Sequence, residues 1–292
     1  MPPLSPASLS PSPAASSSPF PCPSPFPFPC PSPSSSPALR ASVVAALRAA
    51  GCVFAEDEAE LILTAARTPD ELTILVDRRV AGLPLEQVLG WAEFHGLRIA
   101  VDPGVFVPRR RTEFLVDQAL DRAPGASVVV DLCCGSGAVG AALAAALGPV
   151  ELHAADIDPT AVRCARRNID PVRGRVHAGD LFEALPGALR GRVDILAANV
   201  PYVPTEEVGL LPAEARDHEP LVALDGGADG LDVLRRVTAG APDWLAPGGC
   251  LLVETSEHQS SAAVEAFRRA GLTTRLAVSG ELHANVVIGT KP

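Results

Sequence analysis

The sequence predicts an α/β fold in which a mostly parallel β-sheet carries helices on both faces, with a small helical domain in front of it. From about residue 126 onward, short β-branched apolar runs alternate with Ala- and Leu-rich segments of helical length, a pattern typical of this fold class. Between residues 38 and 83, apolar side chains recur at helical spacing instead. Because ligands of parallel sheets bind at the carboxyl ends of the strands, we expect the functional site at that edge.

The composition indicates an acidic protein with a sizeable core. Its 292 residues suffice for one large or two modest domains, and 47% of them are hydrophobic. The formal net charge of −10, from 24 basic and 34 acidic residues, argues against stable nucleic-acid binding. Seven cysteines without metal-like spacing indicate reduced thiols and a cytoplasmic protein. No apolar run reaches the ~20 residues that a membrane-spanning helix needs.

Residues 1–37 consist almost entirely of Pro, Ser, Ala and Phe, and no charged residue precedes Arg40. A secretory signal begins with basic residues and a transit peptide is rich in arginine, so neither type of segment fits. We predict a disordered, partly polyproline tail, with a proline-rich ligand for a recognition module as the alternative.

Residues 38–83 are predicted to form a helical N-terminal domain. Gly51 suits the end of a first helix. Thr68 followed by Pro69 suits the start of a third helix, which runs to Val80. A partner-docking module and a packing lid are both consistent with such a bundle.

Residues 84–113 are predicted to be a linker that contains a β-hairpin. Residues 93–101 alternate like a strand, Asp102-Pro103-Gly104 marks the turn, and residues 105–107 resume a strand. Three arginines follow at positions 109–111. Such a run could meet phosphates or an acidic partner, but it is more often a solvated loop.

Residues 114–292 carry the alternating pattern and are predicted to form the sheet domain. The expected strands are 127–132, 150–155, 175–178, 193–198, 250–254, 272–278 and 285–289, with a turn at 247–249 before the fifth. The first two helices are expected at 137–147 and 159–168. Short strands and helices in this order favour parallel strand pairing.

The loop between the first strand and the first helix is the candidate cofactor site. Asp131 precedes this loop, which comprises Cys133, Cys134, Gly135, Ser136 and Gly137. Asp156 ends the second strand 21 residues after Gly135, where an acid commonly bridges ribose hydroxyls. The glycine spacing is not that of a pyrophosphate-binding loop, and Asp131 suits a positively charged ligand group. Both points favour S-adenosylmethionine over a dinucleotide.

Three further positions near this loop receive a prediction. Asp180 follows the third strand and could meet an adenine amine, with Leu181 against the ring. The alternative for Asp180 is a helix N-cap. Cys133 and Cys134 are expected to pack under the loop rather than to bind a metal ion.

Asn199-Val200-Pro201-Tyr202 is the candidate acceptor site, since it directly follows the buried strand 193–198. The Asn amide offers one acceptor and two donors, Pro201 restricts the backbone, and Tyr202 offers a flat face. These groups suit a planar substrate that bears an NH2 group, such as a carboxamide or a base amine. The alternative is an ordinary strand followed by a Pro-rich turn.

Taken together, these motifs resemble the class I S-adenosylmethionine-dependent methyltransferases, and among them the glutamine N(5)-methyltransferases of peptide chain release factors. The resemblance covers the chain from about Ala38 to its end. The matching segments are Val107-Pro108-Arg109 with Thr112-Glu113, the Asp131 loop, Ala155-Asp156, Asn199-x-Pro-Tyr202, His218-Glu219-Pro220 and Ala223-Leu224-x-Gly226-Gly227-x-x-Gly230-Leu231. The last two are the narrowest.

The resemblance implies a Rossmann-like, seven-stranded sheet whose last strand is antiparallel, and a helical domain that helps to hold a release factor. It implies methylation of the Gln side chain in a Gly-Gly-Gln tripeptide. Cofactor contacts would fall to residues 133–137, Asp156 and Leu181, and Asn199 to Tyr202 would hold the glutamine. Val200 replaces a family Pro, Cys133 a family Gly and Leu181 a common aromatic residue, so the chain looks like a divergent branch.

The expected chemistry is methyl transfer to an amide nitrogen. The Asn199 side-chain oxygen and the Val200 carbonyl would accept the two N–H groups of the amide, and Tyr202 would pack on its plane. The nearest alternative is an N(6)-adenine or N(2)-guanine methyltransferase that grips a flipped base at the same edge. A scaffold that binds the cofactor without turnover and a dinucleotide-dependent oxidoreductase are further alternatives.

Overall fold

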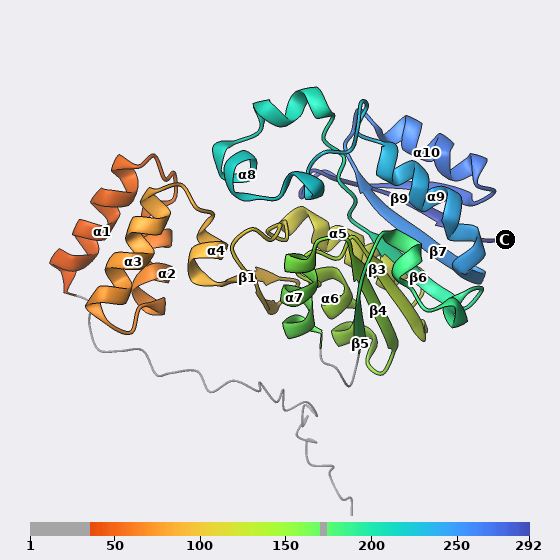
Figure 1. Cartoon of the computed structure of the whole chain (residues 1–292), viewed down its shortest axis with the longest axis horizontal. Helices are drawn as coiled ribbons and strands as arrows, with labels where there is room; N and C mark the ends of the chain where they lie inside the picture. Colours follow the sequence, from red (N-terminus) through yellow and green to blue (C-terminus); the bar gives the residue numbers. More distant parts are fainter. Residues whose placement is uncertain (1–35, 170–173) are drawn as a thin grey trace, which may run out of the picture. The chain divides into compact units, whose positions relative to one another are not determined.

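The computed structural model describes residues 36–169 and 174–292, and its central feature is a seven-stranded sheet in the order β5-β4-β3-β6-β7-β9-β8 (Figure 1). The strands are β3 (Val128–Leu132), β4 (Glu151–Asp156), β5 (Gly174–Ala178), β6 (Val193–Ala198), β7 (Leu245–Thr255), β8 (Thr273–Ser279) and β9 (Ala284–Thr290). The first five in this order pair in parallel, and β9 is antiparallel to both of its neighbours. The expected sheet and its antiparallel last strand are therefore confirmed.

Helices cover both faces of this sheet. The longer helices of this region are α5 (Glu113–Arg122), α6 (Ala138–Leu147), α7 (Pro159–Asn168), α9 (Asp232–Trp244) and α10 (Ser260–Arg269). Side chains of α5, α6 and α7 share one hydrophobic cluster with the sheet, and side chains of α9 and α10 share a second cluster with it. The strands β3 and β6 are buried on both faces, which explains their continuous apolar sequences.

Four helices precede the sheet: α1 (Pro37–Ala49), α2 (Ala55–Ala65), α3 (Pro69–Val80) and α4 (Leu85–Leu89). The Ser36 hydroxyl caps α1, and the Thr68 hydroxyl caps α3. Gly51 follows the end of α1 with a φ of 88°, as expected. These helices pack around a hydrophobic cluster of their own. The proposed domain boundaries stay a prediction, and the predicted tail lies, up to residue 35, outside the described residues.

The hairpin differs from the expectation. Its strands are β1 (Trp91–Phe94) and β2 (Leu97–Ala100), so the chain turns at His95 and Gly96 and not at residues 102–104. Both turn residues have positive φ, 50° and 72°, which gives a two-residue turn whose twist matches a hairpin. The predicted turn position was wrong, and residues 105–107 are not a strand in the structure.

The fifth predicted strand was also placed incorrectly at its start. The strand β7 begins at Leu245, and the expected turn at residues 247–249 lies inside it. The register with β6 shifts there, because Val193 pairs with Leu245 while Ile195 pairs with Cys250. Pro247, Gly248 and Gly249 therefore form an irregularity within the strand. No helix in the described part of the chain is both long and apolar enough to cross a bilayer.

Candidate functional site

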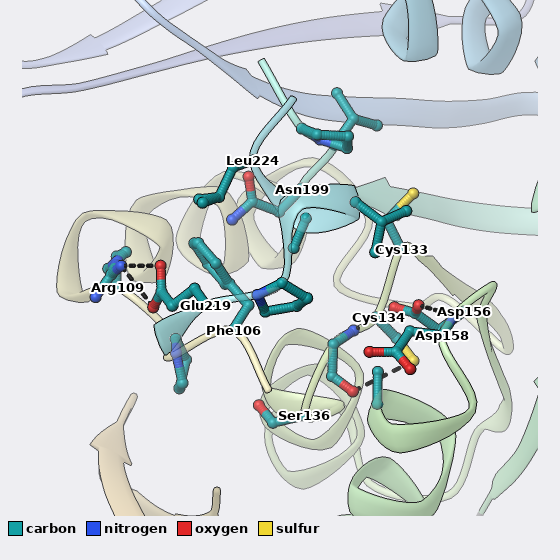
Figure 2. A pocket seen from close by; sticks show the side chains of 18 of the residues that line it. Phe106, Arg109, Cys133, Cys134, Ser136, Asp156, Asp158, Asn199, Glu219 and Leu224 are labelled. Atoms are coloured by element: carbon teal, nitrogen blue, oxygen red, sulfur yellow. Dashed lines mark hydrogen bonds and ion pairs between the residues drawn. The ribbon is translucent and has the colours of Figure 1, made fainter. Parts of the chain in front are cut away.

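A cavity of about 650 Å³ lies at the carboxyl ends of β3, β4 and β6. Its lining includes nearly all of the residues predicted for the site, namely Asp131, Cys133, Cys134, Gly135, Ser136, Asp156, Asp180, Leu181, Asn199, Val200, Pro201 and Tyr202. Figure 2 labels ten of the lining residues that it draws, with Asp156 and Asn199 among them. The structure thus brings the two predicted half-sites into one cavity.

Gly137 is the exception among the predicted residues. It does not line the cavity. A Cβ at this position would lie 3.1 Å from Ile169 and 3.2 Å from Ala165, so the absence of a side chain lets the loop pack against α7. Gly137 contributes to the position of the loop and not to its surface.

Asp156 braces the loop that follows β3. One of its carboxylate oxygens accepts the Gly135 N–H at 2.8 Å, and the other accepts the Asp158 N–H at 2.9 Å. Burial raises the pKa of Asp156, although these donors act in the opposite direction. Gly135, which lines the cavity, has a φ of 55°, a conformation that glycine adopts readily. The result is a fixed, backbone-lined cradle with a carboxylate beside it.

Asp131 lies at the base of this cradle and is 2% exposed. Its Oδ2 accepts the Gly140 N–H of α6 at 2.8 Å. Burial raises the pKa of Asp131 to about 7, and the Gly140 donor opposes this shift. A positively charged group in the cavity would favour the ionised form.

Asp180 and Leu181 line the same part of the cavity. The Asp180 side chain does not cap the short 3-10 helix that follows it, so the capping alternative is wrong. Instead its Oδ2 accepts from Arg236 at 2.6 Å. Leu181 is 9% exposed and has a φ of 47°, an uncommon backbone conformation for a branched residue. Such positions often belong to a binding surface.

The adjacent cysteines pack as expected. Cys134 is buried in the cluster below α5 and α6, while Cys133 is half-buried against the opposite cluster. Burial raises the pKa of both thiols, which keeps them protonated and unreactive.

Asn199 directly follows β6, and its orientation is defined by a neighbour from the linker. Its Nδ2 donates to Thr112 Oγ1 at 3.4 Å. Among the hydrogen bonds of the described residues, none is accepted by the Asn199 Oδ1 or by the Val200 carbonyl. Two acceptors at the cavity wall are therefore available to a ligand. The Val200 side chain is 1% exposed and packs in the core.

Tyr202 lines the cavity, and its hydroxyl is hydrogen-bonded to two charged side chains. Arg111 donates to the hydroxyl, and the hydroxyl donates to Glu254 at 3.4 Å. Burial and the Glu254 charge raise the pKa of Tyr202 to about 12. The phenol is thus neutral at physiological pH and is unsuited to act as a general base.

The interpretation of residues 109–111 as a solvated loop was wrong for two of the three arginines. Arg109 Nη2 binds both carboxylate oxygens of Glu219, at 2.7 and 2.6 Å, and Arg111 Nε binds Glu254 at 2.9 Å. Glu219 also accepts the Val107 N–H at 3.1 Å. Figure 2 shows the Arg109–Glu219 pair beside Phe106. Two of the matching motifs, 110 residues apart in the chain, meet in this ion pair.

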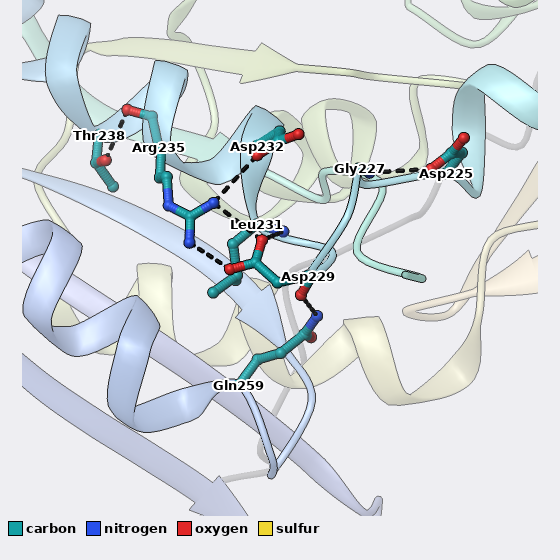
Figure 3. Close-up of polar contacts among 8 residues, drawn as sticks. All are labelled: Asp225, Gly227, Asp229, Leu231, Asp232, Arg235, Thr238 and Gln259. Atoms are coloured by element: carbon teal, nitrogen blue, oxygen red, sulfur yellow. Dashed lines mark hydrogen bonds and ion pairs between the residues drawn. The ribbon is translucent and has the colours of Figure 1, made fainter. Parts of the chain in front are cut away.

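The glycine-rich segment, which contains Gly226, Gly227 and Gly230, packs against residues 199–203. These residues form the acceptor loop. A Cβ on Gly226 would lie 2.7 Å from the Pro201 carbonyl, and one on Gly230 would lie 2.3 Å from the Tyr202 carbonyl. Gln259 Nε2 donates to the Tyr202 carbonyl at 2.8 Å and to the Asp229 carbonyl at 2.9 Å. Figure 3 shows this segment, where Arg235 also bridges Asp229 and Asp232. The segment is a backbone support for the acceptor loop and not a free surface loop.

The cavity therefore has two chemically distinct parts. One part, with the glycine loop and Asp156, suits a nucleoside with hydroxyl groups and a charged tail. The other part, with the free oxygens of Asn199 and Val200, suits a donor such as an NH2 group. A ligand in each part would place the two reactants in contact.

The comparisons with known proteins agree with this arrangement. Residues 96–211 match a family model described as Methyltransferase small domain. A release factor glutamine methyltransferase from Geobacter sulfurreducens is 41% identical over 208 residues, which cover 70% of this chain and 72% of that protein. This chain belongs to the release factor glutamine methyltransferase family.

The chain is also similar to a methyltransferase with a different named substrate and to a methyltransferase of known structure. A 4-amino-L-phenylalanine/4-methylamino-L-phenylalanine methyltransferase from Streptomyces pristinaespiralis is 34% identical over 232 residues, covering 76% of this chain and 78% of that protein. The crystal structure of a methyltransferase from Pyrococcus furiosus has a TM-score of 0.51 at 18% identity, covering 67% of this chain and 89% of that one. The latter shows likeness of fold.

Several site residues of this family member escaped the sequence reasoning. The sequence indicates Thr112, Glu219 and Arg109 only as members of motifs, and no motif contains Glu254. The detectable signal was the co-occurrence of an arginine motif and a Glu-Pro motif, because a buried glutamate needs a positive partner.

Proposed function

We propose that this protein transfers a methyl group from S-adenosylmethionine to the side-chain amide nitrogen of a glutamine in a peptide chain release factor. The observation that carries the proposal is a pair of oxygen acceptors at the cavity wall, Asn199 Oδ1 and the Val200 carbonyl, which accept no hydrogen bond from the described residues. An amide NH2 group has two protons to donate. These two acceptors match that donor set.

The residues of the cradle fit the cofactor. Asp156 stands where it can accept from ribose hydroxyls, and Leu181 and Ile157 offer apolar surface in the same cavity. Asp131 supplies negative charge near the loop. When bound, S-adenosylmethionine supplies a methyl group on a positively charged sulfur. We assign cofactor binding to Asp131, residues 133–136, Asp156, Asp180, Leu181 and Asn199, with Gly137 as a packing residue.

The chemistry required of the protein is alignment. The nitrogen lone pair of an amide is delocalised into its carbonyl, so both N–H groups must be held with the lone pair directed at the methyl carbon. Asn199 Oδ1 and the Val200 carbonyl accept these N–H groups, while Tyr202 packs on the amide plane and Pro201 fixes the backbone. Positioning the reactants at ~3–3.5 Å supplies much of the rate. The two oxygens also stabilise the positive charge that develops on nitrogen.

No general base is needed before methyl transfer. Once the new N–C bond has formed, the nitrogen is strongly acidic and loses one proton to solvent. The neutral Tyr202 phenol is not the acceptor of that proton, because its hydroxyl is bound by Arg111 and Glu254. The Val200 contribution uses its carbonyl alone, which explains how a valine can replace a proline at this position.

One other acceptor class is supported by a specific observation. The Streptomyces pristinaespiralis relative is named for an aromatic amine substrate, and an arylamine also presents an NH2 group. The net charge of −10 disfavours an RNA or DNA acceptor. The free thiols of the described cysteines support a cytoplasmic location for the protein.

The test is a methyl-transfer assay with purified full-length protein and labelled S-adenosylmethionine. The acceptors are a release factor, 4-amino-L-phenylalanine and total RNA. We expect one methyl group on the Gln of the Gly-Gly-Gln tripeptide, located by mass spectrometry. Labelling of the aromatic amine or of RNA, with an unlabelled release factor, would overturn the proposal.

The Asn199→Ala variant tests the acceptor assignment. Loss of an oxygen that acts on developing charge is expected to lower kcat by about 100-fold or more. Affinity for S-adenosylmethionine, measured by calorimetry, should change by less than about threefold because the main cofactor contacts remain. A variant with normal turnover would show that Asn199 does not hold the acceptor.

A further inference from the structure

The Asn199 side chain can serve an amide substrate in only one of its two orientations. Its carboxamide has an oxygen end and an NH2 end of nearly the same shape. If the NH2 end faced the substrate, two donors would meet and the substrate N–H would have no acceptor. Packing alone cannot distinguish the two orientations, so a polar neighbour must do so.

A directional chain of hydrogen bonds ends at this amide. Glu254 forms an ion pair with Arg111, and as a carboxylate it can only accept. Its Oε2 lies 2.6 Å from Thr112 Oγ1, so the one hydroxyl proton of Thr112 is donated to Glu254. The Thr112 oxygen is then left as an acceptor, and Asn199 Nδ2 lies 3.4 Å from it. The Asn199 oxygen must therefore point the other way.

The fold fixes the positions of Glu254, Thr112 and Asn199 relative to one another. The parallel strands β6 and β7 pair Ala198 with Val253, so Asn199, just after β6, and Glu254, near the end of β7, are the next residues on neighbouring strands. Thr112 comes from the linker and is 2% exposed, as is Glu254. Thr112 also stands at the N-cap of α5, yet its side chain makes no capping bond. A hydroxyl that would ordinarily stabilise the helix is used at the site instead.

We propose that Thr112 and Glu254 are positioning residues that fix the Asn199 carboxamide with its oxygen toward the acceptor. This inference rests on the proposed function. It adds the groups that make the Asn199 side chain present its oxygen, and not its NH2 group, to the substrate amide. Neither residue touches the reacting atoms. Their contribution is to ensure that Asn199 accepts, and does not donate, the hydrogen bond to the substrate amide.

The first test compares three threonine variants. Thr112→Val removes the hydroxyl at nearly constant volume and is expected to lower kcat/KM for the acceptor by about tenfold or more. Thr112→Ser keeps the hydroxyl and should remain within about threefold of the unmodified protein. Thr238→Val is the matched control, because Thr238 is also 2% exposed but donates only to the Arg235 carbonyl of α9. It should leave kcat/KM unchanged.

The second test reverses the polarity of the chain. Glu254→Gln can donate an N–H to Thr112, which frees the Thr112 hydroxyl to donate to Asn199 and turn its amide. We expect a loss similar to that in Thr112→Val. Since both changes act through Asn199, the double variant Thr112→Val with Glu254→Gln should lose little more than either single variant. If the losses in kcat/KM of the two single variants multiplied in the double variant, Thr112 and Glu254 would not act through the same residue.

The third test does not depend on activity. In the ¹⁵N-labelled, ligand-free protein, the Asn199 side-chain NH2 signals are assigned by their loss in Asn199→Ala. We expect them to shift in Thr112→Val but not in Thr112→Ser or Thr238→Val. Unshifted signals in folded Thr112→Val would overturn the proposal even if no glutamine substrate were methylated. Equal activity losses in the Val and Ser variants would also overturn it, whereas an inactive unmodified protein would refute the proposed function instead.

Discussion

Cys133 has a backbone conformation that suits glycine better than cysteine. Its φ is 53°, and a left-handed conformation costs a residue with a side chain roughly 1–2 kcal/mol. The thiol packs against the core on one side of the sheet, which offsets part of that cost. A cysteine is therefore tolerated at this position because its half-buried side chain packs against the core.

Substitutions at Cys133 should follow this account. Cys133→Gly relieves the conformational cost and loses the packing, so the free energy of unfolding should change by less than about 1 kcal/mol. Cys133→Val should be destabilising by about 1–3 kcal/mol because a β-branched residue is poorly suited to positive φ. Denaturant unfolding measures both.

The control for this pair is Cys250→Val. Cys250 is fully buried in β7, where a β-branched residue is compatible with the backbone. A Cys133→Val variant that is as stable as Cys250→Val would show that the conformation at 133 carries no cost.

Asp131 should make stability depend on pH. Its pKa of about 7 lies above the ordinary value of 3.8, so between about pH 4 and pH 7 the unfolded chain releases a proton that the folded protein keeps. The folded state is thereby favoured less as pH rises through this window, by up to about 1.4 kcal/mol per pH unit. Urea unfolding at several pH values should show this slope in the ligand-free protein and a smaller slope in Asp131→Asn.

The same residue should affect cofactor binding. A positively charged ligand favours the ionised carboxylate, so affinity for S-adenosylmethionine should rise as pH increases through about 7. Asp131→Asn keeps an acceptor for the Gly140 N–H and lacks the charge. If calorimetry gave the same pH profile for both proteins, Asp131 would not be responsible.

At the residue scale, the sequence predicts groups that follow buried strands and misses groups that act through tertiary contacts. Asn199 is recognisable because it follows a largely apolar strand, and Asp156 because it ends the second strand 21 residues after Gly135. Thr112 and Glu254 are 142 residues apart, and neither sequence neighbourhood indicates that the other is near. Their roles depend on the register of β6 with β7.

The acceptor loop and the glycine-rich segment act as one element. The chain pairs at Val203 and Asp225, and the Gly226 N–H donates to the Val203 carbonyl at 2.8 Å. Because these contacts are between backbones, the side chain at position 200 can vary without loss of the support. The close approach does require that certain glycines have no side chain.

Gly230→Ala should disrupt this element. Gly230 has a φ of 73°, and a Cβ there would lie 2.3 Å from the Tyr202 carbonyl and 2.2 Å from Gln259 Nε2. We expect the displaced acceptor loop to lower kcat by about tenfold or more, while cofactor affinity stays within about threefold. Methyl-transfer kinetics and calorimetry separate these effects.

Gly187→Ala is the control for that experiment. No atom lies within 4 Å of a Cβ at Gly187 and its φ is not positive, so activity should not change. An equal loss in both variants would argue against a specific role of the glycine-rich segment.

At the element scale, the long apolar runs were enough to place most strands, and the marked turns were the source of error. Asp102-Pro103-Gly104 contains three turn-forming residues, yet the hairpin turns at His95-Gly96, which has one. The antiparallel register, which pairs Trp91 with Ala100 and Phe94 with Leu97, leaves only His95 and Gly96 to form the turn. Local turn preference is weak against such a pairing.

In the molecule as a whole, one buried arginine connects the N-terminal helices with the segment beside the cavity. Arg79 of α3 forms a two-bond ion pair with Glu58 of α2, at 2.6 and 3.1 Å. It also contacts Glu214 of α8 (Ala213–His218) at 2.6 Å, and Glu214 lines the cavity. The helical region and the acceptor side of the cavity thus share a charged group.

The ion pairs of Arg79 with Glu58 and with Glu214 should contribute differently to the free energy of unfolding. Arg79→Met leaves Glu58 buried and unpaired, which is expected to cost about 3–5 kcal/mol. Adding Glu58→Leu should recover most of that loss, because an apolar pair is often as stable as a buried ion pair. Glu214→Gln should cost less than about 1 kcal/mol, since Glu214 is about half exposed. Urea unfolding of the four proteins provides the comparison, and a mild effect of Arg79→Met would contradict it.

The seven strands of the sheet are not sufficient to form the acceptor side of the cavity, beside Asn199 and Val200. Val107, Arg109, Arg111 and Thr112 all lie upstream of the first strand of the sheet, and each is bonded to a group that the later chain supplies. A fragment trimmed to begin at Glu113 would retain every strand of the large sheet and lose these partners. The smallest portion of the chain capable of turnover therefore extends well beyond the smallest portion that preserves the strand arrangement, and deletion series intended to locate the enzyme's minimal unit should start upstream of Val105.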